Sequence, residues 1–432
     1  MIWVPTAKVD LDAYRASIGD ELALEIESLA GQVKGLRAIH LNGTPAGGGV
    51  AEILRSLVPL LKGLGVEAEW HVVSPDDGFF EVTKKIHNLL QGKAGSLTET
   101  ERLVYLEHAR QTAQEAKRLG ADVWVIDDPQ PMPIVGFDEG LHPAVWRCHI
   151  DTSQPNPEVS SFLLPYLQRY DEFIFTLPDY VFPSIDQAKV NFFFPALDPL
   201  TAKNAPLDRG FAKRVLQKLG IAPDRPLVTQ VSRFDPWKDP IGVVEAYRLV
   251  KKEMPELQLA LVGTMKALDD PEAVRILAAV QGQAAGDPDI HLYSDANQVG
   301  DLEVNAFQTA SAVIVQKSIR EGFGLTVTEA MWKGTPVVGG NVAGIRAQIC
   351  DGENGFLVDS VEECADRILT LLQDPVLAHQ MGQAGQESVR RRFLIPVLLR
   401  DHLRLLVRLA SSNLSSLGLS QVREIEDLGK AA

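Results

Sequence analysis

The 432 residues of this chain exceed what one ordinary hydrophobic core organises, so we expect two domains. With 45% hydrophobic and 23% charged residues, the composition is that of a soluble folded protein. The formal net charge of −15 argues against nonspecific nucleic-acid binding, which needs clustered cations. No segment approaches the roughly 18 uninterrupted apolar residues of a membrane span, and charges interrupt the opening where a signal peptide is apolar.

These features predict a cytoplasmic protein that binds neither nucleic acid nor membrane. The cysteines Cys148, Cys350 and Cys364 are too few and too scattered for a disulfide framework or a metal site, so we expect reduced thiols. Nor does any His/Cys/Asp cluster show the spacing of metal ligands.

In the first half of the chain, short runs rich in Val, Ile, Phe and Trp predict strands. These runs are residues 37–42, 67–73, 122–127, 144–150, 172–177 and 190–195. Between the first two, apolar residues from Val50 to Leu64 recur with helical spacing, and Gly65 is placed to end a helix. We therefore predict an amphipathic helix within 47–65.

The same alternation restarts after residue 206. Strands are predicted at 226–232, 257–263, 289–293, 312–316 and 335–340, and helices at 240–253, 270–283, 303–310 and 325–334. Strand–helix alternation implies parallel sheets with helices on both faces, and two such series suggest two doubly wound α/β domains facing across a cleft. The expected domains are 1–203 and 204–392, with 393–432 forming a helix that crosses back to the first domain and a loosely held polar tail from 413.

Ligands of doubly wound sheets bind beyond the carboxyl ends of the strands, so residues that follow strands are the candidates. The first candidate is "NGTPAGGGVAE", in which Gly48 and Gly49 lie where a helix begins. Such glycines let the main chain approach a ligand, and a helix N-terminus attracts an anion such as a diphosphate. Glu52 stands where a dinucleotide fingerprint has its third glycine, which weakens a dinucleotide interpretation. A flexible turn is the alternative.

The second candidate is "QVSRFDPWKD", where Arg233 and Lys238 follow a predicted strand. Both cations fit one diphosphate, the arginine as a fork and the lysine as a point charge. The alternative is two solvated surface cations.

The third candidate is "KSIREGFGLTVTEAMWKG", in which Glu321 lies in a loop after a strand and Glu329 in the first turns of the next helix. The N–H groups of Gly322, Phe323 and Gly324 suit the hydroxyls of a polar ligand, and the two carboxylates suit a sugar and a ribose. Glutamates eight residues apart also arise by chance, and a helix start favours an acidic residue in any case.

The fourth candidate joins "IDDPQPMP" and "AVWRCHIDTS", because Asp128 and His149 each lie at the end of a predicted strand of the first domain. A buried histidine is more often a satisfied core residue than a catalytic one. An aspartate before proline is more often a turn or helix-cap signal than a ligand.

Taken in order along the chain, these motifs resemble glycosyltransferase family 4. "EGFGLTVTE" is similar to the E-x7-E signature of that family, whose members are retaining enzymes with two Rossmann-like domains in the GT-B fold. More narrowly, "GGGVAEILRSLVPLL", "WRCHID", "QVSRFDPWK" and "SIREGFGLTVTEAMWKG" resemble the trehalose-synthesising glycosyltransferases, from about Val9 to Leu409. Those enzymes transfer glucose from a nucleoside diphosphate glucose to free glucose.

The resemblance implies roles for specific residues. The first domain would be the acceptor side and the second would bind the nucleotide sugar. The donor-binding residues would be Gly48, Gly49, Arg233, Lys238, Gly322, Phe323, Gly324, Leu325, Thr326 and Glu329, with Gly48 and Gly49 near the diphosphate and Glu329 on the ribose hydroxyls. The catalytic residues would be Glu321, His149, Arg233 and Lys238, and the acceptor-side candidates Asp128, Glu52 and His149.

Two departures from the wider family stand out. Asp239 follows Lys238 where glycine is common, and Ile345 and Arg346 occupy the places of a common Pro-Glu pair, a change that fits the trehalose-forming branch. No cofactor is expected beyond the nucleoside diphosphate glucose as donor substrate, and Mg²⁺ is not implied, because arginine, lysine and a helix terminus can stabilise the diphosphate. Sugar substrates are the expected partners, and a homodimer is a family-level expectation.

Several alternatives stay open at this point. A trehalose phosphorylase or a sucrose-forming transferase would share the fold. From other classes, Glu321 and Glu329 would serve as the carboxylate pair of a glycoside hydrolase, or the protein would bind a nucleotide sugar without turnover. The nucleobase of the donor is not assigned.

Overall fold

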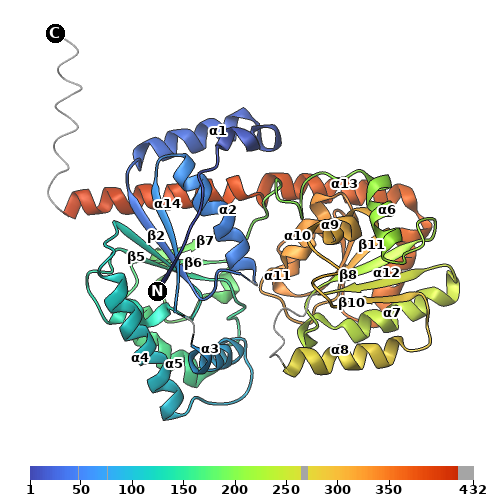
Figure 1. Cartoon of the computed structure of the whole chain (residues 1–432), viewed down its shortest axis with the longest axis horizontal. Helices are drawn as coiled ribbons and strands as arrows, with labels where there is room; N and C mark the ends of the chain where they lie inside the picture. Colours follow the sequence, from blue (N-terminus) through green and yellow to red (C-terminus); the bar gives the residue numbers. More distant parts are fainter. Residues whose placement is uncertain (47, 75, 264–270, 417–432) are drawn as a thin grey trace, which may run out of the picture. The chain divides into compact units, whose positions relative to one another are not determined.

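The computed structural model describes residues 1–46, 48–74, 76–263 and 271–416, and these form two α/β units (Figure 1). One unit comprises Met1–Phe193 together with the chain from Pro396 onward, and the other comprises Phe194–Ile395. The chain thus passes between units ten residues before the expected 203/204 boundary, because residues 194–203 pack with the second unit. Most of the expected tail, 417–432, lies outside the described residues.

The first unit is built on a seven-stranded sheet. Its strands are β1 (Ile2–Val4), β2 (Arg37–Asn42), β3 (Glu67–Val72), β4 (Val123–Asp127), β5 (Ala144–Cys148), β6 (Glu172–Phe175) and β7 (Val190–Phe192), in the spatial order β1-β3-β2-β4-β5-β6-β7. Every neighbouring pair in this described sheet is parallel except β1 with β3. The chain leaves β2 toward β3 on one side and returns to β4 on the other, so β2 and β4 flank a topological switch point.

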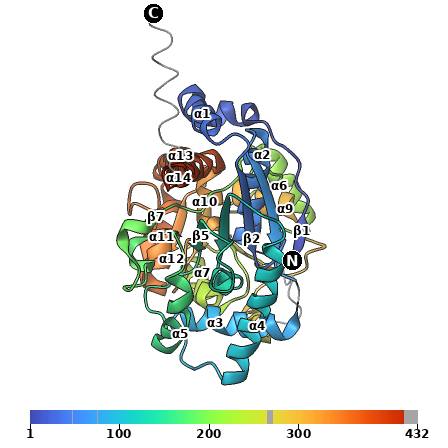
Figure 2. The same ribbon diagram turned by 90° about the vertical axis from the view of Figure 1, so that its left-hand side faces the viewer.

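Helices cover this sheet. They are α1 (Arg15–Gln32), α2 (Gly49–Gly63), α3 (Asp77–Leu90), α4 (Glu99–Ala116), α5 (Pro157–Leu167) and α14 (Ile395–Ser416), with short 3-10 turns at Leu11–Tyr14, Met132–Gly136, Pro178–Tyr180 and Gln187–Lys189. α14 belongs to this unit through side-chain bonds from Arg404 to Glu25 and from Arg408 to Asn191, which join it to α1 and β7. Figure 2 shows α14 in dark red beside α1.

The second unit carries a six-stranded parallel sheet. Its strands are β8 (Leu227–Val231), β9 (Gln258–Val262), β10 (Ile290–Tyr293), β11 (Val313–Gln316), β12 (Val337–Gly340) and β13 (Phe356–Val358), in the order β10-β9-β8-β11-β12-β13. Its helices are α6 (Arg209–Lys218), α7 (Pro240–Glu253), α8 (Pro271–Ala284), α9 (Asp301–Ala310), α10 (Leu325–Trp332), α11 (Ala343–Arg346), α12 (Val361–Gln373) and α13 (Pro375–Arg392), with a 3-10 turn η5 (Pro236–Lys238). Here β8 and β11 flank the switch point.

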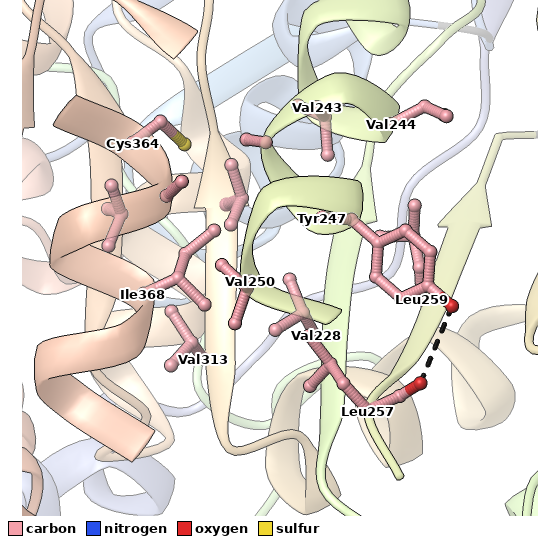
Figure 3. Close-up of a cluster of buried hydrophobic side chains, with 14 of the residues drawn as sticks. Val228, Val243, Val244, Tyr247, Val250, Leu257, Leu259, Val313, Cys364 and Ile368 are labelled. Atoms are coloured by element: carbon pink, nitrogen blue, oxygen red, sulfur yellow. Dashed lines mark hydrogen bonds between the residues drawn. The ribbon is translucent and has the colours of Figure 1, made fainter. Parts of the chain in front are cut away.

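Apolar residues on both faces explain why this second sheet is buried. On one face Val228 and Leu259 pack with residues of α7 and α12, and the hydroxyl of Tyr247 lies 3.4 Å from the main-chain oxygen of Leu257 (Figure 3). On the other face their sequence neighbours Leu227 and Ala260 pack against α6 and α9. The alternation along each strand thus fills two cores.

All predicted strands and helices are present, with ends shifted by a few residues. Several elements were not predicted individually, among them β1, β13, α1, α4 and α13. β1 and β13 have three residues each, too few for a periodic signal. α4 is rich in charged and polar residues, and its start depends on a capping box between Thr98 and Glu101.

None of the described helices is long and apolar enough to span a membrane.

Candidate active site

The loops after β8 and β11 bring donor-site candidates together at the switch point of the second sheet. Lys238 ends the 3-10 turn that follows β8, and Glu321 lies in the loop that follows β11. Their side chains form an ion pair between Nζ and Oε2 and are 17% and 12% exposed. The hydroxyl of Ser318 lies 3.4 Å from the same carboxylate oxygen. A cation and a carboxylate are therefore held side by side where α/β sheets bind ligands.

The main chain at Asp239 explains the first departure from the family pattern. Asp239 has φ 45° and ψ 53°, in the left-handed region that glycine adopts most readily and that aspartate tolerates better than most residues. Its carboxylate accepts the N–H of Gly242 at 3.1 Å as the N-cap of α7. The other oxygen accepts from the buried Lys317 ammonium. Asp239 thus reproduces the turn of a glycine and ties the Lys238 loop to the end of β11.

Residues 322–326 present unpaired main-chain donors at the start of α10. In the part of the chain that the structure describes, the N–H groups of Gly322, Phe323 and Gly324 donate to no protein acceptor. Gly324, the N-cap, has φ 87°, which favours glycine. Leu325 and Thr326 open the helix. These donors suit an anion or the hydroxyls of a sugar.

The loop 321–324 is supported from α11 and the turn after it. A Cβ on Gly344 would lie 2.6 Å from the main-chain oxygen of Glu321, so only glycine fits this approach. The buried Gln348 amide donates to the main-chain oxygens of Phe323 and Gly324 at 2.5 and 3.3 Å, and its oxygen accepts from Thr328 at 2.6 Å. In the "AGIRAQI" segment, Ile345 is buried and Arg346 bonds to the main-chain oxygen of Asn341 at 3.1 Å.

Glu329 is only 2% exposed, and its described partners do not include Lys238 or Glu321. Its Oε1 accepts from Lys203 at 2.7 Å and its Oε2 from the Gln308 amide at 2.9 Å. Burial favours the acid form, but Lys203, Lys333 and Gln308 outweigh burial and hold the pKa of Glu329 below its ordinary value. Burial, with Lys203 nearby, lowers the pKa of Lys333 to about 7. Both oxygens of this predicted ribose ligand therefore have protein partners.

Arg233 differs from Lys238 because its side chain is 73% exposed and makes only a 3.4 Å contact with Asp235. It follows β8 by two residues, so it lies on the same loop as Lys238 without touching the Lys238–Glu321 pair in the contacts described. Its role at a diphosphate stays a prediction.

In the first unit, the glycine-rich segment follows β2 and leads into α2. Gly48 is the N-cap of α2 and Gly49 its first residue, while Glu52 lies in the first turn. Gly48 has an extended main chain, and a Cβ added there would meet no described atom within 4 Å. The described protein thus does not itself require glycine at 48, which leaves room for a ligand to approach the helix start.

Asp128 and His149 meet, as expected of residues that follow adjacent parallel strands. The N–H of His149 donates to Oδ1 of Asp128 at 3.0 Å. Asp128 has φ 63°, one of two non-glycine residues with positive φ in the described chain. The ring of His149 bonds through Nε2 to Oδ1 of the neighbouring Asp127 at 2.8 Å. Burial raises the pKa of Asp128 and, with help from Arg147, lowers that of His149 to about 3.

Sequence reasoning missed four residues that hold the candidates in place: Asp127, Lys203, Lys317 and Gln348. Asp127 adjoins the predicted Asp128 at the end of β4, and Lys317 directly follows β11 in the motif that contains Glu321, so both positions carried a signal. Lys203 approaches Glu329 from a segment without a motif, and Gln348 lies in the segment 343–349, where only the departure at Ile345 and Arg346 was noted; only the three-dimensional structure reveals the contacts of both residues.

No group of three or more His, Cys, Asp or Glu side chains in the described residues is arranged to hold a metal ion. The three cysteines form no disulfide; Cys148 and Cys364 are buried and Cys350 is exposed.

Comparison with known proteins extends across both units. Residues 40–182 match the family model for the trehalose synthase N-terminal domain, and residues 212–388 match that for group 1 glycosyl transferases. The trehalose synthase of Rubrobacter xylanophilus is 47% identical over 401 residues, covering 92% of this chain and 96% of that protein. A trehalose phosphorylase of Pleurotus pulmonarius is a more distant relative, 29% identical over 88% of this chain and 58% of its own length.

Among solved structures, a sucrose-phosphate synthase from Thermosynechococcus elongatus superposes with a TM-score of 0.68 at 21% identity, covering 87% of this chain and all of that one. This likeness concerns the fold, which is GT-B, with two Rossmann-like α/β domains, as predicted. By its match to trehalose synthase over nearly its whole length, the chain belongs to the trehalose synthase family of glycosyltransferases.

Proposed function

We propose that this protein transfers the glucosyl group of a nucleoside diphosphate glucose to free glucose, with retention at the anomeric carbon, and so forms trehalose reversibly. The observation that carries the proposal is 47% identity to a trehalose synthase across both units. The Lys238–Glu321 pair at the switch point of the second sheet supports it.

In this reaction the bond from the glucosyl C1 to the β-phosphate oxygen breaks, and a bond from C1 to the anomeric oxygen of glucose forms. The diphosphate takes the bonding electrons and leaves, and the hydroxyl proton of the acceptor passes to the departing diphosphate oxygen and from there to solvent. The main task of the protein is to stabilise the charge that grows on the diphosphate. Lys238, Arg233 and the N–H groups of residues 322–324 are the groups we assign to this task, while Glu321 holds the transferred sugar.

The environment of Glu329 favours a transferase over a glycoside hydrolase. A hydrolase needs two carboxylates at one bond, one of them able to take or give a proton. Glu329 is buried, its pKa is lowered, and both oxygens are bonded to Lys203 and Gln308. Glu329 is therefore unsuited to proton transfer, and we place it on the donor side, at the ribose, on the ground of the family resemblance alone.

One experiment separates the candidate activities. The protein is incubated with UDP-, ADP- or GDP-glucose and with glucose or fructose as acceptor, and separately, without nucleotide, with trehalose in the presence and absence of phosphate. Products are identified with their anomeric configuration. We expect α,α-trehalose from glucose with at least one donor. Sucrose, glucose 1-phosphate formed from trehalose and phosphate, or glucose released without a nucleotide would support the sucrose-forming, phosphorolytic or hydrolytic alternatives. Tight donor binding without any product would support a sensor.

We further propose that no metal is needed, because the cations and helix N-terminus can stabilise the diphosphate. The same assay with excess EDTA should retain its rate, and restoration by Mg²⁺ after a loss would contradict this. Location in the cytoplasm and assembly as a homodimer stay predictions, which cell fractionation and sedimentation would check.

A further inference from the structure

One face of the first sheet carries a row of buried polar side chains. Asp127 on β4 is the register partner of Arg147 on β5, so their side chains lie on the same face of the sheet. His149 follows Arg147 by two residues and His40 lies on β2. From α14, the Nε2 of His402 lies 3.5 Å from the Arg147 guanidinium. Asp127, Arg147, His40 and His402 are each at most 2% exposed.

This row is incompletely satisfied. In the described part of the structure, Oδ2 of Asp127, Nη2 of Arg147 and Nδ1 of His40 are buried without a hydrogen-bond partner. Unpaired buried polar atoms are unfavourable and rare in folded proteins, so stability alone does not account for Asp127. The one side-chain hydrogen bond described for its carboxylate, from Oδ1 to Nε2 of His149, points instead to a role in orienting that ring.

We propose that Asp127 is a positioning residue for His149, which it holds as the neutral imidazole with the proton on Nε2. The Nδ1 lone pair is then left to accept a hydrogen bond from a hydroxyl of the bound sugar. The place of His149 beside the sugar rests on the proposed function; its tautomer does not.

Two restraints fix the ring. The carboxylate of Asp127 can only accept when ionised, so the Nε2 that it contacts carries the hydrogen. The main chain of His149 is held by Asp128, whose Oδ1 accepts its N–H. The side chain of His149 is 9% exposed. Because Nε2 faces a buried carboxylate, Nδ1 is the ring nitrogen left for a sugar hydroxyl.

Charges around the pair support this protonation state. Burial raises the pKa of Asp127 to about 6, opposed by Arg147 and His40. Burial and Arg147 lower the pKa of His149 to about 3, opposed by Asp128. From α14, His402 is itself neutral, because burial and Arg147 hold its pKa well below the ordinary value. At pH 7 the pair is therefore an ionised carboxylate and a neutral imidazole.

A pH dependence follows. As pH falls through about 6, Asp127 gains a proton and can donate to His149 instead of accepting from it. The ring then no longer has a fixed tautomer, and turnover should fall on the acid side near pH 6. This limb belongs to Asp127 and should disappear when Asp127 is replaced by a residue that does not titrate.

The first test is spectroscopic and needs no turnover. In protein labelled with ¹⁵N-histidine, the ring nitrogens of His149 are assigned by their absence in His149→Gln. We expect the Nε2–H tautomer in the wild-type protein at pH 7. A wild-type ring protonated on Nδ1, or on both nitrogens, would overturn the proposal even if the protein proved to make a different product.

The second test uses Asp127→Asn, whose amide can donate to Nε2 and so favours the other tautomer. We expect kcat to fall roughly 10- to 100-fold with little change in KM, and the acid limb near pH 6 to vanish. The matched control is Asp171→Asn at the opposite end of β5, where Asp171 accepts from His142 at 2.9 Å and from the N–H of Ala144 at 2.7 Å. This control should leave kcat unchanged.

Activity of Asp127→Asn within twofold of wild type, with an unchanged pH profile, would refute the positioning role. If Asp127→Asn does not fold, the wild-type tautomer decides the question by itself.

Discussion

At the scale of single residues, the Lys238–Glu321 pair gives the most direct prediction. Lys238→Ala removes a cation that we assign to the departing diphosphate, so kcat should fall about 10²- to 10³-fold, as when one oxyanion donor is lost. The fold should be kept with a loss of stability of about 1–3 kcal/mol, because the substitution removes one member of an ion pair whose side chains are only 17% and 12% exposed. Lys252→Ala, an exposed lysine in the last turn of α7, is the control and should keep its activity. Near-normal turnover in Lys238→Ala would reject its role.

Asp239 allows a second test at this scale, because it has three separable functions. It adopts the left-handed conformation, caps α7 through the N–H of Gly242, and pairs with the charge of Lys317. Asp239→Asn keeps a residue that tolerates the left-handed conformation and an oxygen for the N–H of Gly242, but loses the charge facing Lys317. Asp239→Gly keeps only the conformation, and Asp239→Ala keeps none of the three. Urea unfolding should rank them Asn, Gly, Ala in decreasing stability, with Ala losing about 2–4 kcal/mol.

Asp239→Gly is the more decisive variant for the role of the carboxylate. Glycine is the common residue of the wider family at this position. If Asp239→Gly is as stable and as active as the wild-type protein, the carboxylate contributes nothing, and the ion pair with Lys317 is incidental.

Lys238, Glu321 and Asp239 also show how much of the site can be predicted from the sequence. Lys238 and Glu321 were predicted as site residues because each follows a strand, and parallel strand ends meet at one edge of a sheet. Their direct contact was not predicted, because a loop side chain has no periodicity from which to read its direction. Asp239 was noted only as a departure; its main-chain conformation and its bond to Lys317 exist only in the folded chain.

At the scale of elements, the segment 198–205 is pinned onto α9 and α10 around Glu329. The amide of Asn305 donates to the main-chain oxygens of Ala202 and Ala205 at 3.0 and 2.9 Å, and Trp332 donates to that of Asn204 at 3.0 Å. Lys203 of this segment reaches Glu329 at 2.7 Å. The predicted boundary at 203/204 thus cuts through a docked segment, because an irregular sequence between Pro199 and Pro206 looks like a linker whether or not it packs.

Because Lys203 and Lys333 approach Glu329 differently, their removal should affect the stability of the second unit to different degrees. Lys203→Met removes the ion partner of a fully buried carboxylate and should destabilise the second unit by about 1–3 kcal/mol. The loss should be smaller than for a buried carboxylate with no cation nearby, because Lys333 remains close to Glu329. Lys333→Met is the matched control. The pKa of Lys333 is about 7, so this lysine is only partly charged at neutral pH and its loss should matter less. Urea unfolding of the two variants at pH 7 measures the difference.

In the Lys203→Met protein, the pKa of Lys333 should also rise, since Lys203 no longer repels its charge. Equal destabilisation by the two substitutions, or a greater loss in Lys333→Met, would contradict the assignment of Lys203 as the main partner of Glu329.

At the scale of the whole molecule, the two units differ in which buried groups respond to pH. In the first unit, burial lowers the pKa of His40 to about 4 and that of His402 well below its ordinary value. In the second unit the buried titrating pair is Glu329 with Lys333. Since the chain forms two compact units, we expect it to unfold in two transitions, and because their buried titrating groups differ, these transitions should differ in pH dependence, which scanning calorimetry can resolve.

The contribution of His402 to the pH dependence of the first unit's stability can be measured separately. Its Nδ1 lies 3.1 Å from the main-chain oxygen of Leu398 and its Nε2 faces Arg147, so the folded state holds the ring neutral. Once unfolded, the ring binds a proton below its ordinary pKa of about 6.5. A lowered folded pKa therefore contributes stability that is present above about pH 6.5 and is lost as the pH falls toward the folded value.

His402→Gln cannot take up this proton, so between pH 6.5 and 4 its stability should fall less steeply than that of the wild type. The expected difference is about 1.4 kcal/mol per pH unit, the value for one proton. The first unit's calorimetric transition measures this slope. His379→Gln, at an exposed position on α13 in the second unit, should leave that slope unchanged. If stability falls with pH equally steeply in the wild type and in His402→Gln, the ring is already charged in the folded protein. That result would contradict the neutral ring that burial beside Arg147 predicts.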